Sequence, residues 1–187
     1  MEYICGFTFA PFCGAGILSS ASAKESLKQM QERTGADFVI FAPNGVQKNA
    51  HSEEICYTSE ATMTDEELVE MITYAKELGL RVALKPTANC ADGTWRAFIS
   101  FFDYDVVCEA KWSNWFPSYT AFQLHYAKIA EKTGCEIFIA GCEMVMTEHR
   151  EKEWRKLISD IKEVYHGFVS YNTDKYQEEH VTWWDAV

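Results

Sequence analysis

The chain has 187 residues, of which 48% are hydrophobic and 14% aromatic, and this is enough to bury a globular core. Its formal net charge of −11 argues against binding to nucleic acid or to an anionic membrane, because those partners need clustered Lys and Arg. No apolar run approaches the roughly 18 residues that a bilayer span requires, and the opening MEYICGFTFAPF lacks the basic start of a signal peptide.

A short strand, YICGFTF, opens the chain, and two amphipathic helices follow it in the first half. We expect these helices to start at Ser22 and Thr64, because each is followed three residues later by a glutamate in the capping-box pattern. The two glutamates are Glu25 and Glu67. A glycine ends each helical pattern, where a left-handed cap is common, and a short apolar strand comes next.

Two further helix–strand units occupy the second half of the chain. Pro117 suits the first turn of the third helix, and the fourth helix carries an apolar stripe that includes Trp154. The strands Val39–Phe41, Val82–Leu84 and Ile137–Ile139 are nearly continuous apolar runs, which are typical of parallel strands covered on both faces. One strand followed by four helix–strand units predicts either a doubly wound sheet or a (β/α)8 barrel.

The lengths of the connections favour the barrel. The connections after each helix are one or two residues long, whereas those after the strands are long, namely 43–63, 87–116 and 142–148. Long loops at the carboxyl ends of the strands are the active-site layout of a TIM barrel, which needs eight strands and typically about 250 residues. We therefore predict one α/β domain over 1–187, an incomplete (β/α)8 TIM-barrel type with about five βα units. The segment VTWWDAV is expected to reach the start of a sixth strand.

Glu143 stands directly after the buried strand CEIFIAG, at the predicted active-site end. A buried carboxylate costs several kcal/mol unless it is paired or has a task. One interpretation is a carboxylate that favours the dipole of the next helix, although the helix signals begin only around Thr147. The other is a general acid/base, because a carboxyl group in a partly apolar pocket can donate a proton near neutral pH.

Aromatic residues follow several strands on the same predicted face: Phe9, Trp95, Trp112, Trp115 and Phe116. Each of them alone fits core or loop packing. Together with a strand-end glutamate they favour a carbohydrate cleft, since flat rings stack on the apolar faces of sugars.

Polar side chains also gather after strands three and five, where they either solvate the loops, contact sugar hydroxyls or hold the glutamate. They are Lys85, Asn89, Asp92, Arg96, Asn172 and Lys175. The histidines show no metal-ligand spacing and H-E-x-x-H is absent, so we expect no metal. No G-x-G-x-x-G follows the first strand, so no cofactor is expected either. Seven cysteines without a C-x-x-C pair fit reduced thiols and a cytoplasmic location.

Several stretches resemble the glycoside hydrolases of clan A, and most closely the family 113 β-mannanase-like group. These stretches are FAP, GLRVALKP, DGTWR, WFPSYTAFQLHYAKIAEKTGCEIFIAGCEM and EWRKLI. The resemblance covers the whole chain, but it corresponds only to the N-terminal part of such an enzyme. It implies a retaining hydrolase that acts on β-linked glycans.

By this resemblance, Glu143 matches the acid/base at the end of strand four, and the nucleophilic glutamate ends strand seven, beyond residue 187. Many clan members carry Asn directly before the acid/base, where it contacts a substrate hydroxyl, and this sequence has Cys142 there. The implied partner is an oligosaccharide or polysaccharide. The chain alone is expected to lack the nucleophile and to leave a strand edge unpaired.

Three explanations stay open for that departure: a truncated hydrolase, a barrel completed by a partner chain or a second copy, or a degenerate sugar-binding remnant. The alternative function is accordingly a non-catalytic carbohydrate-binding half-barrel that self-associates or needs a partner chain.

Overall fold

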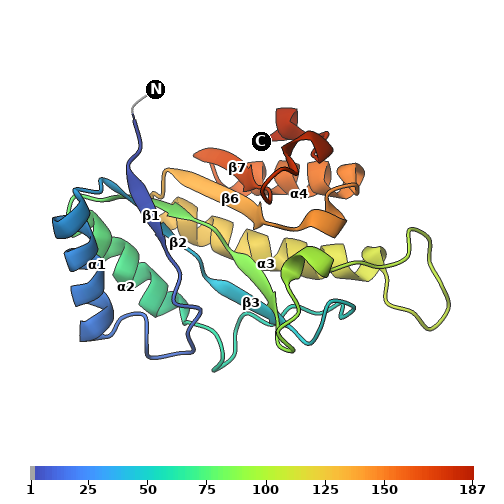
Figure 1. Cartoon of the computed structure of the whole chain (residues 1–187), viewed down its shortest axis with the longest axis horizontal. Coiled ribbons are helices and arrows are strands. Elements are labelled where there is room, and N and C mark those ends of the chain that lie inside the picture. Colours follow the sequence, from blue (N-terminus) through green and yellow to red (C-terminus); the bar gives the residue numbers. More distant parts are fainter. Residues whose placement is uncertain (1–2) are drawn as a thin grey trace.

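The computed structural model describes residues 3–187 and contains a parallel five-stranded sheet in the order β1-β2-β4-β6-β7 (Figure 1). Its strands are β1 (Gly6–Phe9), β2 (Phe38–Phe41), β4 (Arg81–Leu84), β6 (Ile137–Cys142) and β7 (Phe168–Asn172). The spatial order follows the chain order, so each crossover steps in the same direction. A doubly wound sheet would reverse direction at a switch point, and the predicted partial (β/α)8 barrel is therefore confirmed.

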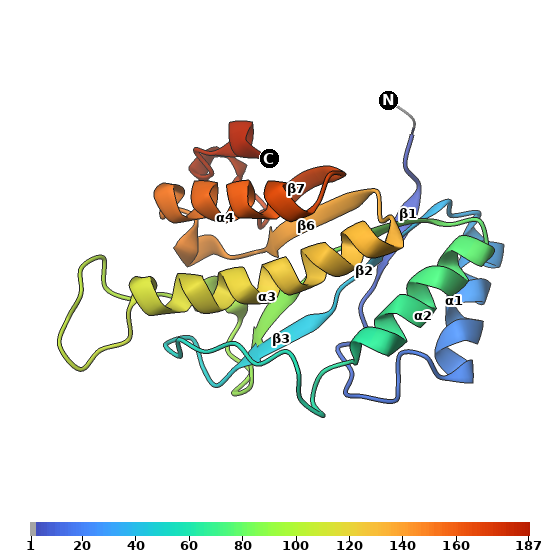
Figure 2. The same cartoon turned by 180° about the vertical axis from the view of Figure 1, so that it is seen from behind.

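Four helices cover one face of this sheet, as the two opposite views show (Figures 1 and 2). They are α1 (Ala21–Thr34), α2 (Asp65–Glu77), α3 (Trp112–Thr133) and α4 (Glu151–Val164). Side chains from the strands and helices share one core, in which Phe41, Leu84 and Phe138 are fully buried. Among residues 3–187, no helix combines the length and the hydropathy needed to cross a membrane.

Two of the strands continue past a proline. β3 (Asn44–Gln47) extends β2 beyond Pro43, and β5 (Thr87–Cys90) extends β4 beyond Pro86. Because proline has no N–H to donate, the ladder is interrupted there, and it resumes where the Thr87 N–H donates to the carbonyl of Pro43 at 2.9 Å. The long loops expected at 43–63 and 87–116 therefore begin with paired strands.

Two helix starts differ from the sequence prediction. The first helix is capped by Ser20, whose hydroxyl accepts the N–H of Ala23 at 3.2 Å, and not by Ser22. The third helix begins at Trp112, so Pro117 lies inside it and not in its first turn. Burial of aromatic side chains such as Trp115 in this early turn outweighs the hydrogen bond that Pro117 cannot make. The predicted box at Thr64 and Glu67 is present.

The C-terminal segment 181–187, where the start of a sixth strand was expected, instead contains a 3-10 turn, Trp184–Ala186. Trp183 is fully buried and stacks on Trp154, with ring centroids 4.8 Å apart. Stacking on α4 holds this segment against the helical layer, which prevents an extended conformation in these residues.

Glu67 connects the start of α2 with the loop before α1. Its side chain is buried, and its carboxylate accepts the N–H of Thr64 at 2.9 Å and that of Leu18 at 3.1 Å. Burial acts to raise the pKa of Glu67, but the backbone N–H groups outweigh burial, and the pKa lies below its ordinary value. The charged form therefore stabilises the fold.

We predict that Glu67→Gln lowers the free energy of unfolding by about 1–3 kcal/mol at pH 7, because the backbone donors lose a charged acceptor. The native pKa is lowered, so this stabilisation is complete above the ordinary value of 4.5 and is lost as the pH falls through the native value. Urea denaturation at pH 7 and pH 3 measures it, with exposed Glu66→Gln as control. An equal loss at both pH values would contradict the prediction.

Candidate active site

The chain turns sharply where β6 ends. The pairing of β6 with β7 shifts register between Ile139 and Cys142, and the N–H of Glu143 then donates to the carbonyl of Asn172 at 2.7 Å. Glu143 adopts a left-handed backbone conformation, with φ of 54°. This conformation costs a residue with a Cβ atom about 1–2 kcal/mol, so the surrounding structure must hold it in place.

The end of β6 is packed too tightly for a side chain at Gly141. A Cβ atom there would lie 2.8 Å from atoms of Trp154 and Tyr171 and 2.9 Å from the hydroxyl of Tyr119. The same hydroxyl donates to the carbonyl of Ala140 at 3.1 Å. Three aromatic rings thus fix the strand two residues before Glu143.

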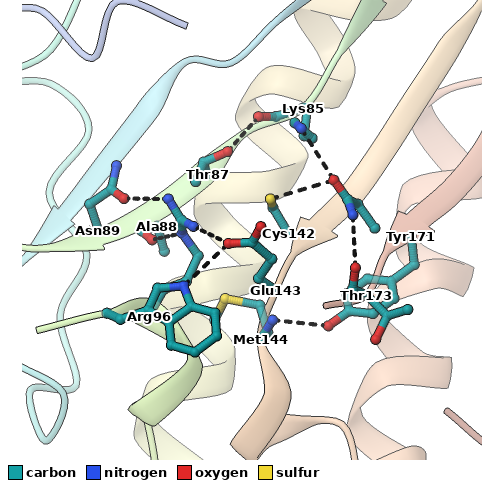
Figure 3. Close-up of polar contacts among 12 residues, drawn as sticks. Lys85, Thr87, Ala88, Asn89, Arg96, Cys142, Glu143, Met144, Tyr171 and Thr173 are labelled. Carbon is teal, nitrogen blue, oxygen red and sulfur yellow. Dashed lines mark hydrogen bonds and ion pairs between the residues drawn. The ribbon is translucent and has the colours of Figure 1, made fainter. Parts of the chain in front are cut away.

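The Glu143 carboxylate is held by two N–H donors (Figure 3). Its Oε2 accepts from Arg96 Nη1 at 2.6 Å and from Trp95 Nε1 at 3.2 Å. Arg96 is itself fixed by the carbonyl of Ala88 at 3.1 Å and by Asn89 Oδ1 at 2.9 Å. We expected a partly apolar pocket around this carboxyl group, and that expectation is wrong. The Glu143 carboxylate instead forms an ion pair with the mostly buried guanidinium of Arg96, whose side chain is 13% exposed.

The amide of Asn172 is the second polar centre at this end of the sheet. Its Oδ1 accepts from Lys85 Nζ at 3.2 Å and from the Cys142 thiol at 3.6 Å. Burial raises the pKa of the Cys142 thiol, which keeps it protonated and able to donate. Cys142 is buried, so its side chain does not line the open face of the barrel directly. Its thiol instead helps to orient the Asn172 amide.

The other residues predicted to contact substrate differ in their exposure to solvent and in their position relative to Glu143. Trp95 is 42% exposed and meets Phe98 edge to face, with ring centroids 5.7 Å apart. Phe9 is half-buried against Phe41. Lys175 lies beyond β7, where its Nζ is 4.6 Å from the centroid of Tyr176. Of this set, Trp95 is the one in direct contact with Glu143.

Trp112 and Trp115 lie in the core, because α3 starts earlier than the sequence indicates. They are 3% and 0% exposed. Trp115 stacks on Tyr119 at 4.7 Å and donates from Nε1 to Gln47 Oε1 at 3.0 Å. Their rings stabilise the start of α3 and present no face to solvent.

One buried carboxyl near the site was not predicted. Glu148 is 1% exposed, and its Oε1 accepts from the Tyr171 and Thr173 hydroxyls. Both donors lie more than twenty positions away in the sequence, so no local pattern indicates the contact. Within residues 3–187 no group of three His, Cys, Asp or Glu side chains could hold a metal ion, and all seven cysteines are free.

The site is therefore a strand-end carboxylate, paired with a guanidinium and an indole, on the open face of a partial (β/α)8 barrel. The model of glycoside hydrolase family 113 matches residues 7–187. The chain belongs to glycoside hydrolase family 113.

Solved structures agree with this assignment. A family 113 β-1,4-mannanase is 53% identical with a TM-score of 0.98, over all of this chain and 60% of that one. The family 113 β-mannanase AaManA from Alicyclobacillus acidocaldarius, in complex with ManMIm, is 38% identical with a TM-score of 0.93, over all of this chain and 59% of that one.

A more distant structure shares the fold alone. An exo-β-1,4-mannosidase from Opitutaceae bacterium strain TAV5 is 15% identical with a TM-score of 0.51, over 87% of this chain and 30% of that one. A comparison with curated proteins gave no significant match. The chain thus spans about three fifths of the length of the two family 113 structures.

We predict that Arg96 and Glu143 are energetically coupled by about 0.5–1.5 kcal/mol, because the pair is partly shielded from water. A double-mutant cycle with Arg96→Gln and Glu143→Gln, followed by chemical denaturation, measures this coupling. The solvated pair Lys28–Glu32 on α1 is the control and should couple by at most about 0.5 kcal/mol. Additive effects at Arg96 and Glu143 would show that the ion pair does not form in solution.

Proposed function

We propose that the complete protein is a retaining glycoside hydrolase that cleaves β-1,4-linked mannan, and that Glu143 is its general acid/base. The observation that carries the proposal is the carboxylate of Glu143 at the carboxyl end of the fourth strand of the barrel, on the face where catalysis takes place in this fold. The mannan specificity rests on the family 113 structures named as β-1,4-mannanases.

The contacts of Glu143 suit proton transfer at a fixed position. Both N–H donors approach Oε2, and within residues 3–187 no hydrogen bond is made to Oε1. The side chain of Glu143 is 32% exposed, and we propose that Oε1, which these donors leave unbonded, is the oxygen that meets the glycosidic oxygen. In the first step the carboxyl would protonate the leaving sugar, and in the second the carboxylate would take a proton from water.

A retaining mechanism needs a second carboxylate about 5–5.5 Å from the first. Glu148 does not serve this purpose, because it is buried and bonded to Tyr171 and Thr173 of the β7 end. We propose that the nucleophile comes from outside residues 1–187, in the part of the barrel that the longer relatives contain.

Three exposed or half-buried groups beside Glu143 are proposed to bind the substrate. Trp95 offers an indole face for stacking on a pyranose ring while its N–H holds the acid. Lys85 and Asn172, already bonded to one another, are proposed to contact hydroxyl groups of the sugar next to the cleaved bond. Cys142 and Asn89 would act indirectly, through Asn172 and Arg96.

In the complete protein, Glu143→Gln is expected to lower kcat/KM on unactivated β-1,4-mannooligosaccharides by about 10²–10⁴-fold, because the leaving sugar loses its proton donor. The loss should be far smaller on 2,4-dinitrophenyl β-mannoside, whose leaving group needs no proton. The matched control is Glu136→Gln at the opposite end of β6, which breaks an ion pair with the same 2.6 Å separation.

Three outcomes separate the alternatives. Equal losses on both substrates, or no loss on the oligosaccharide, would remove Glu143 from the acid/base role. A first-formed product of α configuration, detected by proton NMR, would contradict retention. Binding of mannooligosaccharides without cleavage by the wild type would favour the non-catalytic half-barrel instead.

A further inference from the structure

Glu148 is a buried carboxyl group that the proposed mechanism does not use. It follows the 3-10 turn Val145–Thr147, five positions after Glu143. Its Oε1 accepts a hydrogen bond from the Tyr171 hydroxyl at 2.7 Å and another from Thr173 Oγ1 at 2.9 Å. Within residues 3–187 its Oε2 has no hydrogen-bond partner. Burial raises the pKa of Glu148. Burying an acidic side chain costs folding free energy, and a functional role would account for Glu148 at this position.

The hydroxyl of Tyr171 donates one hydrogen bond and accepts another. A phenol has a single hydrogen, and Tyr171 gives it to Glu148. Its oxygen is then free to accept, and it receives the backbone N–H of Met144 at 3.1 Å (Figure 3). Met144 is the residue directly after Glu143, so the buried carboxyl is linked through one hydroxyl to the backbone of the site.

Two consecutive residues of β7 therefore fix the backbone on both sides of Glu143. The carbonyl of Asn172 accepts the N–H of Glu143 itself, at 2.7 Å, and the hydroxyl of Tyr171 accepts the N–H of Met144. These are the two peptide N–H groups that flank the Cα atom of Glu143. Holding both N–H groups restricts φ and ψ of Glu143, whose φ of 54° is unfavourable for a residue with a Cβ atom.

We propose that Tyr171, oriented by Glu148, is a positioning residue that fixes the left-handed backbone of Glu143 and so aims its carboxyl group at the glycosidic oxygen. This inference rests on the proposed role of Glu143. It predicts that loss of the Tyr171 hydroxyl misdirects proton transfer while the site stays otherwise intact. A misplacement of about 1 Å is enough to slow a reaction by around 10²-fold.

The surroundings of Tyr171 allow packing and positioning to be separated. Its ring is held edge to face by Trp154 at 5.1 Å and by Trp183 at 4.9 Å. Tyr171→Phe keeps that ring and removes only the hydroxyl. Thr173→Val is the matched control, because Thr173 donates to the same oxygen of Glu148 and within residues 3–187 has no bond to Met144.

The test measures both variants in the complete enzyme, beside the wild type and Glu143→Gln. Tyr171→Phe is expected to lower kcat on β-1,4-mannooligosaccharides by about 10-fold or more and to change KM by less than about 2-fold. Its kcat/KM on 2,4-dinitrophenyl β-mannoside should stay within about 3-fold of the wild type, because that leaving group needs no acid. Thr173→Val should stay within about 2-fold of the wild type on both substrates.

The results distinguish failure of the inference from failure of the proposed function. If Glu143→Gln lowers activity on the oligosaccharide and Tyr171→Phe does not, the positioning role is wrong. It is also wrong if Tyr171→Phe lowers activity by the same factor on both substrates. If Glu143→Gln is itself unimpaired, the proposed function fails first.

A second pair of variants covers the case in which Tyr171→Phe does not fold. Glu148→Gln keeps an acceptor for the Tyr171 hydroxyl and should preserve kcat on the oligosaccharide, whereas Glu148→Leu removes the acceptor and should lower it about 10-fold. Equal kcat in these two variants would overturn the inference.

Discussion

The left-handed backbone conformation of Glu143 is the constraint on which the rest of the site depends. It occurs where the chain leaves β6, and the carboxylate held there meets Arg96. An L-residue resists this conformation by about 1–2 kcal/mol, and both flanking N–H groups donate hydrogen bonds to acceptors on β7, which opposes that cost. The aromatic rings packed around Gly141 keep the preceding residues from moving away.

The opposite side of the site depends on the two strand extensions. Because β4 continues past Pro86 as β5, the backbone carbonyl of Ala88 and the side chain of Asn89 lie where they can hold Arg96. Arg96 lies in the 3-10 turn Arg96–Phe98, beyond the end of β5, and its contacts with β5 orient its guanidinium toward the Glu143 carboxylate. The two sides of β6 thus hold different parts of Glu143. On one side β5 holds its carboxylate through Arg96, and on the other side β7 holds its backbone.

Sequence patterns predicted the fold better than they predicted the site. Helix periodicity, apolar strands and the capping glycines are local signals, and they placed Glu143 correctly at the end of the fourth barrel strand. The sequence named Arg96 among several polar residues that could hold Glu143, but the pairing joins residues 47 positions apart, so no local pattern selects Arg96 from the others. The substrate-contact interpretation of Trp112 and Trp115 failed for a different reason: Pro117 suggested a helix start, which placed both residues in the preceding loop, whereas they lie in the helix with their rings buried.

The central claim is that Glu143 delivers a proton to the glycosidic oxygen. The most direct measurement is a crystal structure of the complete Glu143→Gln variant with a β-1,4-mannooligosaccharide spanning the cleavage site. We expect the substituted side chain within about 3.2 Å of the glycosidic oxygen, with a sugar ring lying over Trp95. An oligosaccharide whose cleavable bond lies away from the carboxyl ends of β4, β6 and β7 would contradict the account.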